Sequence, residues 1–341
     1  MINMIDLRSD TVTRPTPAMM ECIVNAKVGD DVLGDDPGVQ ELEAFMAKMF
    51  SKDASIFCPS GTMTNQIAIK AHTVPGDEVI CESTSHVYRF EGGGMAFNSG
   101  CSVRLIQGDL GRLKPYQIAE NINPPDNVHY PKTRLVVAEN TSNMGGGSIY
   151  DFDDLKQIAA ICREHGLLFH LDGARLFNAL VETGEKTEDY GAIFDSVSIC
   201  FSKGLGAPIG SVLIGNNEFI GRARRIRKLF GGGMRQAGYL AAAALYAVKN
   251  NVSRLKEDHR KAKILAEELS RASFTKEVMP VQTNIVIISL IEKYQQAKLL
   301  GLLNEKGIMA VGFGPDKIRM VTHMDFTDEM LSRSADIFRS L

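Results

Sequence analysis

The sequence is poor in the features that mark secreted, membrane-spanning and metal-stapled proteins. None of its six cysteines forms a CxxC pair, since they stand at positions 22, 58, 81, 101, 162 and 200. No histidine lies at a ligand-like spacing from any of them, so we expect reduced, buried thiols and no metal site. No apolar run approaches the roughly 20 residues that span a bilayer. Charged Asp6, Arg8 and Asp10 stand where a signal peptide would be apolar, and we expect a cytoplasmic protein.

An excess of charge of one sign is also lacking. Lys and Arg number 38 and Asp and Glu number 41, for a net charge of −3. This balance gives no electrostatic reason to expect nucleic acid or an anionic membrane as a partner. With 44% hydrophobic and 23% charged residues among 341, the chain can build a large core and is not disordered. Its length is typical of about two domains.

Short apolar runs alternate with stretches of helical spacing over the first 250 residues. The expected strands are Ser55–Cys58, Glu78–Cys81, Ser102–Ile106, Arg134–Glu139, Leu167–Asp172, Ser196–Phe201 and Gly210–Ile214. Helices are expected between them, as at Thr62–Ala71 and at Phe152–His165, where Asp151 caps the helix and Gly166 ends it. The alternation predicts an α/β domain in which helices cover both faces of a mostly parallel sheet.

The pattern changes after about Asn250. A helix at 253–270, a strand at 284–290, a helix at 294–305, a strand at 318–322 and a helix from 327 predict a smaller α+β domain. We therefore expect a large domain over residues 1–250 and a small one over residues 251–341. Ligands of open α/β sheets bind at the carboxyl ends of the strands, so polar motifs at those ends are candidate site residues.

Two charged residues follow directly on predicted strands. Asp172 ends the strand before a Gly-Ala turn that leads to Arg175, and Lys203 precedes the Gly-rich turn Gly204–Pro208. Burial of an amine favours its neutral, nucleophilic form, which makes Lys203 a candidate nucleophile. Alternatively, Asp172 caps a helix and pairs with Arg175, and a single lysine at a strand end more often reaches solvent.

A third motif, Pro59–Asn65, lies where a strand ends and a helix begins. Ser60 or Thr62 can cap this helix, and Gly61 lets backbone amides approach an anion, as in phosphate sites at helix N-termini. Most such turns bind nothing. In combination, however, the turn, Asp172 and Lys203 fit a Schiff-base site for pyridoxal phosphate, which needs a phosphate cup, an anion for its ring nitrogen and an amine.

These segments also carry a family resemblance. Further matching segments are Asp6–Thr13, Gly29–Val32, Gly231–Gln236 and Val321–His323, so that the likeness runs from the N-terminus to about Asp325. In these residues the chain resembles the L-threonine aldolases, which are fold-type I pyridoxal-phosphate enzymes within the β-eliminating lyase group. The resemblance implies a mostly parallel seven-stranded sheet with helices on both faces, and a smaller C-terminal α+β domain.

The resemblance also implies how the cofactor is held. Lys203 forms the Schiff base with pyridoxal 5'-phosphate, Asp172 pairs with the ring nitrogen, and Gly61 and Thr62 hold the phosphate. His86, in the segment Ser85–Tyr88, matches the family histidine that stacks on the ring. A histidine in that place can both stack and exchange protons near neutral pH.

For the substrate, the resemblance implies that Ser9, Arg175 and Arg319 bind the carboxylate, with Arg175 also near the cofactor. His129 matches a second histidine near the substrate hydroxyl, and which of the two histidines is the base stays open. Arg319 interrupts an apolar strand and must meet an anion. We expect that anion to be the substrate carboxylate, with a structural acid such as Asp325 as the alternative.

Four further positions are notable: two are expected to act across a subunit interface, and two depart from the family pattern. Lys228 and Arg235 match basic positions that the family dimer presents to the neighbouring active site, near substrate and cofactor respectively. Leu33 stands where the family often has Tyr, and Ser142 where it often has His. These two departures affect expectations for side-chain preference and leave the cofactor assignment intact.

The expected function is a pyridoxal-phosphate-dependent aldolase that cleaves L-threonine or L-allo-threonine to glycine and an aldehyde. The expected assembly is a homo-oligomer with the dimer as its active unit. A tetramer is favoured, and the choice between dimer and tetramer stays open. Two alternatives stay open: β-elimination from a cysteine-like amino acid, which would release pyruvate and ammonia, and a non-catalytic module of the same fold. The combination of Lys203, Asp172 and Arg319 argues against the second.

Overall fold

A seven-stranded sheet organises the first part of the chain in a computed structural model that describes residues 4–341. The strands are β2 (Ala54–Cys58), β3 (Glu78–Glu82), β4 (Ser102–Ile106), β5 (Thr133–Glu139), β6 (Leu168–Asp172), β7 (Ser196–Cys200) and β8 (Ser211–Gly215). Their order is β2-β8-β7-β6-β5-β3-β4, with β8 antiparallel to both neighbours and the other pairs parallel. The predicted sheet is confirmed, with each strand within one residue of its expected bounds.

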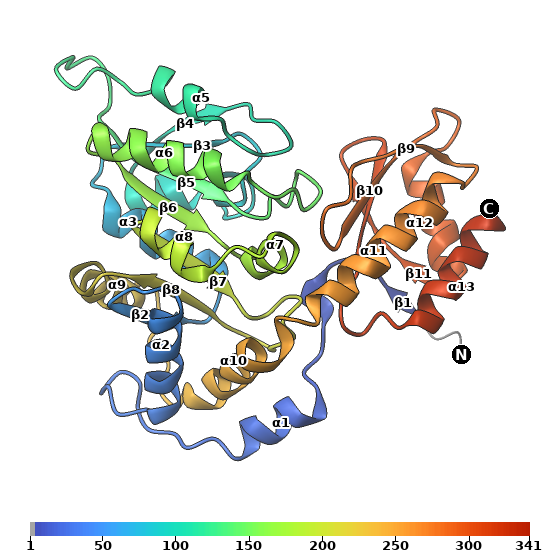
Figure 1. The fold of residues 1–341 in the computed structure, drawn as a ribbon, viewed down its shortest axis with the longest axis horizontal. Coiled ribbons are helices and arrows are strands. Elements are labelled where there is room, and N and C mark those ends of the chain that lie inside the picture. The colour runs from blue at the N-terminus through green and yellow to red at the C-terminus, as the bar shows by residue number, and fades with distance from the viewer. Residues whose placement is uncertain (1–3) are drawn as a thin grey trace.

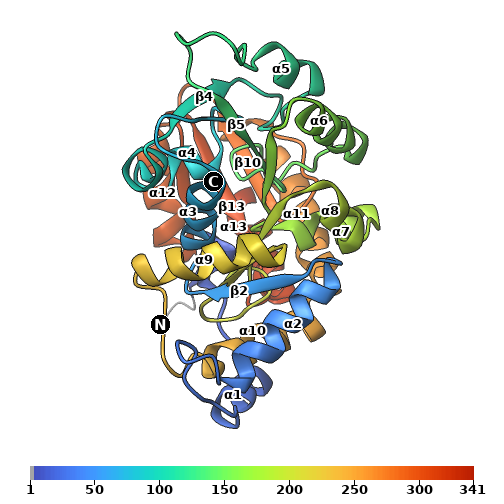
Figure 2. The ribbon, with the colours of Figure 1, turned by 90° about the vertical axis from the view of Figure 1, so that its left-hand side faces the viewer.

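Helices cover both faces of this sheet (Figures 1 and 2). The helices of this part of the chain are α1 (Pro17–Val24), α2 (Pro37–Met49), α3 (Gly61–His72), α4 (His86–Arg89), α5 (Pro115–Glu120), α6 (Phe152–Glu164), α7 (Leu176–Thr183), α8 (Thr187–Ile193), α9 (Asn217–Leu229) and α10 (Gly238–Asn251). Of these, α1 packs on α10 instead of on the sheet. Alternate residues of β5 show the two layers. Val136 and Ala138 belong to the same hydrophobic cluster as side chains of α2 and α6, whereas Leu135 and Val137 belong to the cluster on the face that carries α3. Period-two alternation therefore places apolar side chains on both faces.

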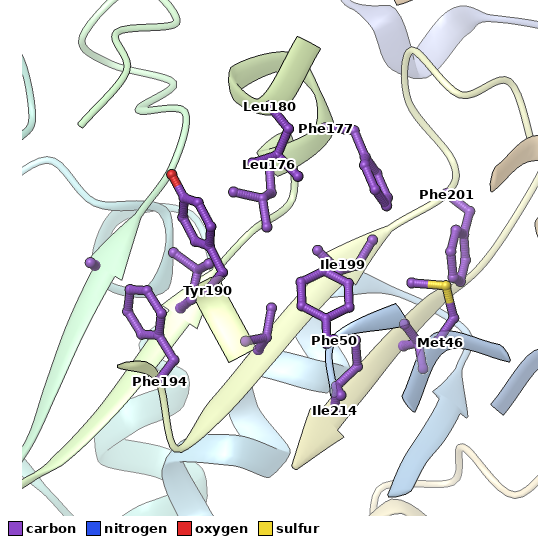
Figure 3. Close-up of a cluster of buried hydrophobic side chains, with 14 of the residues drawn as sticks. Met46, Phe50, Leu176, Phe177, Leu180, Tyr190, Phe194, Ile199, Phe201 and Ile214 are labelled. Atoms are coloured by element: carbon purple, nitrogen blue, oxygen red, sulfur yellow. The ribbon is translucent and has the colours of Figure 1, made fainter. Parts of the chain in front are cut away.

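The larger core lies between β6–β8 and the helices α2, α7 and α8. Figure 3 shows part of it, with Tyr190 and Phe194 beside Leu176, and Phe50 near Ile199. These side chains are almost fully buried. Burying each such aromatic or aliphatic side chain contributes about 1.5–3 kcal/mol. The packing holds the carboxyl ends of β6 and β7 in a rigid frame, which is where the predicted site residues lie.

The rest of the chain forms a second body, on the right in Figure 1. Its elements are α11 (Leu255–Ser270), β9 (Thr275–Val278), β10 (Ile285–Leu290), α12 (Gln296–Glu305), β11 (Ile308–Met309), β12 (Val311–Phe313), β13 (Lys317–Val321) and α13 (Asp328–Arg339). Strands β12-β13-β10-β9 form an antiparallel sheet. The five elements expected after Asn250 are present within two residues, whereas the short strands β9, β11 and β12 were not expected.

The N-terminal segment crosses to this second body. Strand β1 (Ile5–Asp6) pairs in parallel with β11, and Ile5 and Leu7 are buried in the second hydrophobic cluster. Backbone bonds from Leu7 to Met309 and from Val321 to Leu7 hold it between two strands. The next residues, Ser9 and the short 3-10 helix Asp10–Val12, therefore lie at the junction of the two bodies.

Two further expectations concern membranes and thiols. Among residues 4–341, no helix combines the length and the apolar character that crossing a bilayer requires. All six cysteines are free, and five of them are buried. Their burial matches the expectation that they act as small core side chains.

Candidate active site

Asp172 and the residues before Lys203 come from adjacent parallel strands. Asp172 ends β6 and is level with Ser198 of β7, while Lys203 lies in the loop after β7. The Asp172 side chain is buried, and it accepts hydrogen bonds from Ala174 N at 3.1 Å and from Asn65 Nδ2 at 2.8 Å. A buried carboxylate and a half-buried amine thus share one edge of the sheet.

The N-terminus of α3 lies at the same edge. Ser60 caps it, with Oγ accepting from Met63 N at 3.2 Å, which confirms the cap expected at Ser60 or Thr62. A Cβ at Gly61 would overlap Cys200 Sγ at the end of β7, so only glycine allows this close approach of helix and strand. The amides of Gly61 and Thr62 open the helix and have no partner one turn earlier, which suits a phosphate.

Five of the predicted site residues line one cavity of about 510 Å³ between the two bodies. They are Ser9, His86, Arg175, Lys203 and Arg319. Side chains that the sequence did not single out complete the lining, among them Phe90, Asn143, Met144 and Phe313. The cavity joins residues that are up to 310 positions apart, from Ser9 to Arg319.

Arg319 has no acidic partner among residues 4–341. Its Nη1 donates to Asn143 Oδ1 at 3.0 Å and its Nη2 to Arg8 O at 3.3 Å, while the buried Nε has no partner. Burial and the nearby charge of Arg175 lower the pKa of Arg319. The expected alternative partner, Asp325, instead accepts from the backbone of Arg14 at 2.9 Å. The structure therefore argues against a structural ion pair at Arg319.

Arg175 already has a carboxylate partner. Its Nε and Nη2 donate to the two oxygens of Asp10 at 2.8 and 2.7 Å, and both side chains are buried. Burial opposes ionisation of Asp10, but the charge of Arg175, its hydrogen bonds and the charge of Lys203 outweigh it and lower the pKa of Asp10 strongly. Arg175 thus meets the cavity with two of its three nitrogens occupied, so its contact with a substrate stays a prediction.

His86 is oriented by two buried acids. Its Nδ1 lies 2.9 Å from Glu91 Oε1, and its backbone N donates to Glu139 Oε2 at 2.7 Å. Burial opposes protonation of the ring, but the hydrogen bond to Glu91 and the charges of Asp172 and Glu91 prevail and raise the pKa of His86. Glu139 also accepts from Asn143 N at 2.8 Å, so one carboxylate positions both His86 and the partner of Arg319.

Side chains that often bind metals gather here too. Ligand-type atoms of His86, Glu91 and Asp172 lie within 4.8 Å of one another. Each of these side chains has hydrogen-bond partners inside the protein, including Asn65, which donates to both carboxylates. We therefore interpret the group as a hydrogen-bonded network beside the cavity.

Three predicted site residues lie elsewhere in the chain. His129 is exposed in the loop between α5 and β5, next to Val128, which is 94% exposed. Lys228, at the end of α9, lines a different hollow of about 540 Å³, and Arg235 pairs with Asp30 at 2.9 Å. None of the three lines the cavity of its own chain. The predicted role of His129 near the substrate is untested, and the predicted roles of Lys228 and Arg235 need a second copy of the chain.

The two departures from the family pattern also lie outside the cavity lining. Leu33 is 76% exposed and borders the same hollow as Lys228. Ser142 is buried in a turn, where its Oγ accepts from Gly145 N at 3.2 Å, and the next residues, Asn143 and Met144, face the cavity instead. Neither departure changes the residues that surround Lys203.

Sequence reasoning missed Asp10, Asn65, Glu91 and Asn143 as site residues. Asp10 was present only as part of a matching segment. For Asn65 a signal existed, because it lies four residues after Gly61 and hence on the same face of α3. Glu91 and Asn143 lie in loops, where no periodicity indicates which way a side chain points.

Known proteins resemble this chain along most of its length. The profile of the β-eliminating lyase family matches residues 6–293. The low-specificity L-threonine aldolase of Escherichia coli is 43% identical over 338 residues, which cover 99% of each chain. Low-specificity L-threonine aldolase 1 of Arabidopsis thaliana is 41% identical over 329 residues, 95% of this chain and 92% of that protein. The solved structure of Leishmania major threonine aldolase has a TM-score of 0.85 at 22% identity, covering 98% and 99% of the two chains, which confirms the predicted fold class.

Proposed function

Because the chain belongs to the β-eliminating lyase family, with its similarity to L-threonine aldolases extending over 99% of its residues, we propose that it is a pyridoxal-phosphate-dependent aldolase. Its substrates are L-threonine and L-allo-threonine, which it cleaves to glycine and acetaldehyde. The observation that carries the proposal is Arg319, a half-buried cation without an acidic partner in residues 4–341, in one cavity with Lys203. A planar guanidinium in that state suits the carboxylate of an amino acid.

The residues at the sheet edge fit pyridoxal phosphate. Asp172 offers a buried anion to keep a ring nitrogen protonated, and Gly61 and Thr62 offer amides to a phosphate where no Cβ could fit at Gly61. Lys203 offers the amine. When bound, the cofactor supplies an aldehyde that joins an amine as a Schiff base, and a ring that accepts the electrons of a bond broken beside that amine.

The other cavity residues orient the substrate. Ser9 and Arg319 bind its carboxylate. This contact fixes the orientation of the substrate so that its Cα–Cβ bond is the bond positioned for cleavage. Orientation of this kind lowers the activation free energy of the reaction substantially. Arg175 supports them from its pair with Asp10. The raised pKa of His86 makes its ring a stronger base, and we assign to it removal of the β-hydroxyl proton, directly or through water. As that proton leaves, the Cα–Cβ bond breaks, the aldehyde departs and Cα takes up a proton to give glycine.

The assembly is a homo-oligomer in which His129, Lys228 and Arg235 act at the site of a neighbouring subunit. Two subunits form the active unit, and two such dimers form a tetramer. Support comes from their position on the surface of a single chain, away from its own cavity. The six free cysteines support a location in the reducing cytoplasm.

A product analysis tests the function. Purified protein loaded with pyridoxal phosphate is incubated with L-threonine, L-allo-threonine, L-serine and L-cysteine, and products are identified by mass spectrometry. Glycine and acetaldehyde from the two threonine epimers are expected. Pyruvate and ammonia from cysteine without glycine from threonine would instead establish β-elimination. Protein that binds no cofactor and changes no substrate would be a non-catalytic module.

A further inference from the structure

Asn65 lies in the middle of α3 and is 1% exposed, yet it contacts both carboxylates of the site. Its Nδ2 donates to Asp172 Oδ2 at 2.8 Å and to Glu91 Oε1 at 2.9 Å. Glu91 is also hydrogen-bonded to the ring of His86. One buried amide therefore connects the anion assigned to the cofactor with the acid that orients His86.

The opposite side of this amide is held by His170. Its Nε2 lies 3.2 Å from Asn65 Oδ1, and its Nδ1 lies 2.8 Å from Ser196 Oγ. Because carboxylates only accept hydrogen bonds, both N–H groups of Asn65 face them, and Asn65 Oδ1 accepts a hydrogen bond from His170 Nε2. The Ser196 hydroxyl then donates to His170 Nδ1, and its oxygen accepts from His72 Nε2, 2.8 Å away.

Burial keeps the His170 ring of this chain of hydrogen bonds neutral. His170 is fully buried, and burial lowers its pKa to about 4 against the opposing charge of Asp172. At neutral pH His170 is therefore a neutral ring with one donor and one acceptor, as the geometry requires. If the Asn65 amide turned over, its oxygen would face two carboxylates and its NH2 group would face the Nε2–H of His170. The carboxylates and the histidine therefore hold the amide in one orientation together.

The two carboxylates need such a donor. Ligand-type atoms of Asp172, Glu91 and His86 lie within 4.8 Å of one another, and two carboxylates this close repel each other. We propose that Asn65, oriented by neutral His170, is a positioning residue that keeps Asp172 and Glu91 in place as a pair, one for the cofactor and one for His86. The inference rests on the proposed function, since it takes Asp172 as the anion of the cofactor.

The substitution His170→Phe tests this without altering a residue of the cavity. It keeps a buried ring and removes the donor to Asn65. The bond removed joins two neutral groups, and a hydrogen bond of that kind is worth up to about tenfold in an equilibrium. We expect the affinity of cofactor-free protein for pyridoxal phosphate to fall about tenfold and kcat for L-threonine to fall by a similar factor. KM should stay unchanged, because Ser9 and Arg319 keep their places. His170→Gln, whose amide nitrogen can donate to Asn65 Oδ1, should restore both quantities.

His259→Phe is the matched control. His259 is also fully buried, but it lies in α11 and is hydrogen-bonded to Asn178 and Glu182, outside this chain of hydrogen bonds. Both histidine-to-phenylalanine substitutions should lower Tm, whereas only His170→Phe should change cofactor affinity and kcat. If His170→Phe does not fold, Asn65→Ala provides the same two measurements.

Three outcomes would overturn the inference. One is cofactor affinity and kcat within about twofold of wild type when His170 or Asn65 is substituted. Another is an equal loss in His259→Phe, and the third is a His170→Gln protein no better than His170→Phe. Wild-type protein that binds no pyridoxal phosphate, or that forms no glycine from threonine, would refute the proposed function instead, so the two failures are distinct.

Discussion

Replacing Arg319 by Leu separates substrate binding from cofactor binding and from folding. The substitution removes two hydrogen bonds that the charged Arg319 side chain donates to Asn143 Oδ1 and Arg8 O, worth about 1.5 kcal/mol each. It also removes a half-buried charge whose Nε has no partner, and relief of that desolvation offsets the loss. We therefore expect the free energy of unfolding to change by less than about 1 kcal/mol.

The effect on substrate should be much larger. A bidentate, charge-assisted contact with a carboxylate is worth about 2–3 kcal/mol, which corresponds to about a 30- to 150-fold loss in kcat/KM. The absorbance of bound pyridoxal phosphate should persist, because Asp172, Lys203 and the first turn of α3 are unchanged. Steady-state kinetics with L-threonine, an absorbance spectrum and a thermal melt measure the three quantities on one preparation.

Two variants serve as controls for this prediction. Lys317→Leu removes a half-buried cation from the same strand, two residues away and outside the cavity lining, and should leave kcat/KM unchanged. Arg319→Lys keeps the charge without the planar fork and should give an intermediate loss. Unchanged kcat/KM in Arg319→Leu would remove this residue from the site. A protein that unfolds or loses its cofactor would show that the role of Arg319 is structural.

Other predictions concern the amine, the buried ion pair and the assembly. Lys203→Ala should lose the Schiff-base absorbance and reduce turnover by orders of magnitude; retained absorbance with full activity would refute the cofactor assignment. Asp10→Asn should lower the free energy of unfolding at pH 7 by about 3–5 kcal/mol, because it leaves Arg175 buried and unpaired. Since the folded-state pKa of Asp10 lies below its unfolded value, its contribution is present above about pH 4 and is lost as pH falls further. Urea unfolding at pH 7 and pH 3 should therefore show a smaller acid-dependent loss in the variant than in wild type, and equal losses would contradict the argument. Mixing Lys203→Ala with Arg235→Ala protein should restore activity through hybrid oligomers, and no recovery despite demonstrated subunit exchange would exclude shared sites.

The local pattern of the sequence was enough to locate the main sheet and the two strand ends that carry candidate site residues, at Asp172 and before Lys203. Strands β2 to β8 are short apolar runs bounded by turns, and a parallel sheet places Asp172 and the end of β7 at one edge whatever the helices do. The turn at Ser60–Thr62 follows from capping chemistry in the same way. These features depend on neighbours within a few positions, so composition and spacing specify them.

The partners of the charged side chains depended on the tertiary structure. Arg175 meets Asp10 from 165 positions away, because strand β1 pairs with β11 and carries the N-terminal segment to the junction. Arg319 likewise contacts Asn143, and not Asp325, because long-range packing brings these segments together. The spacing of residues in the sequence contains no information about such contacts. The sequence by itself therefore determined which groups could do the chemistry, whereas long-range packing decided which of them share a cavity and which, like His129, face away from it.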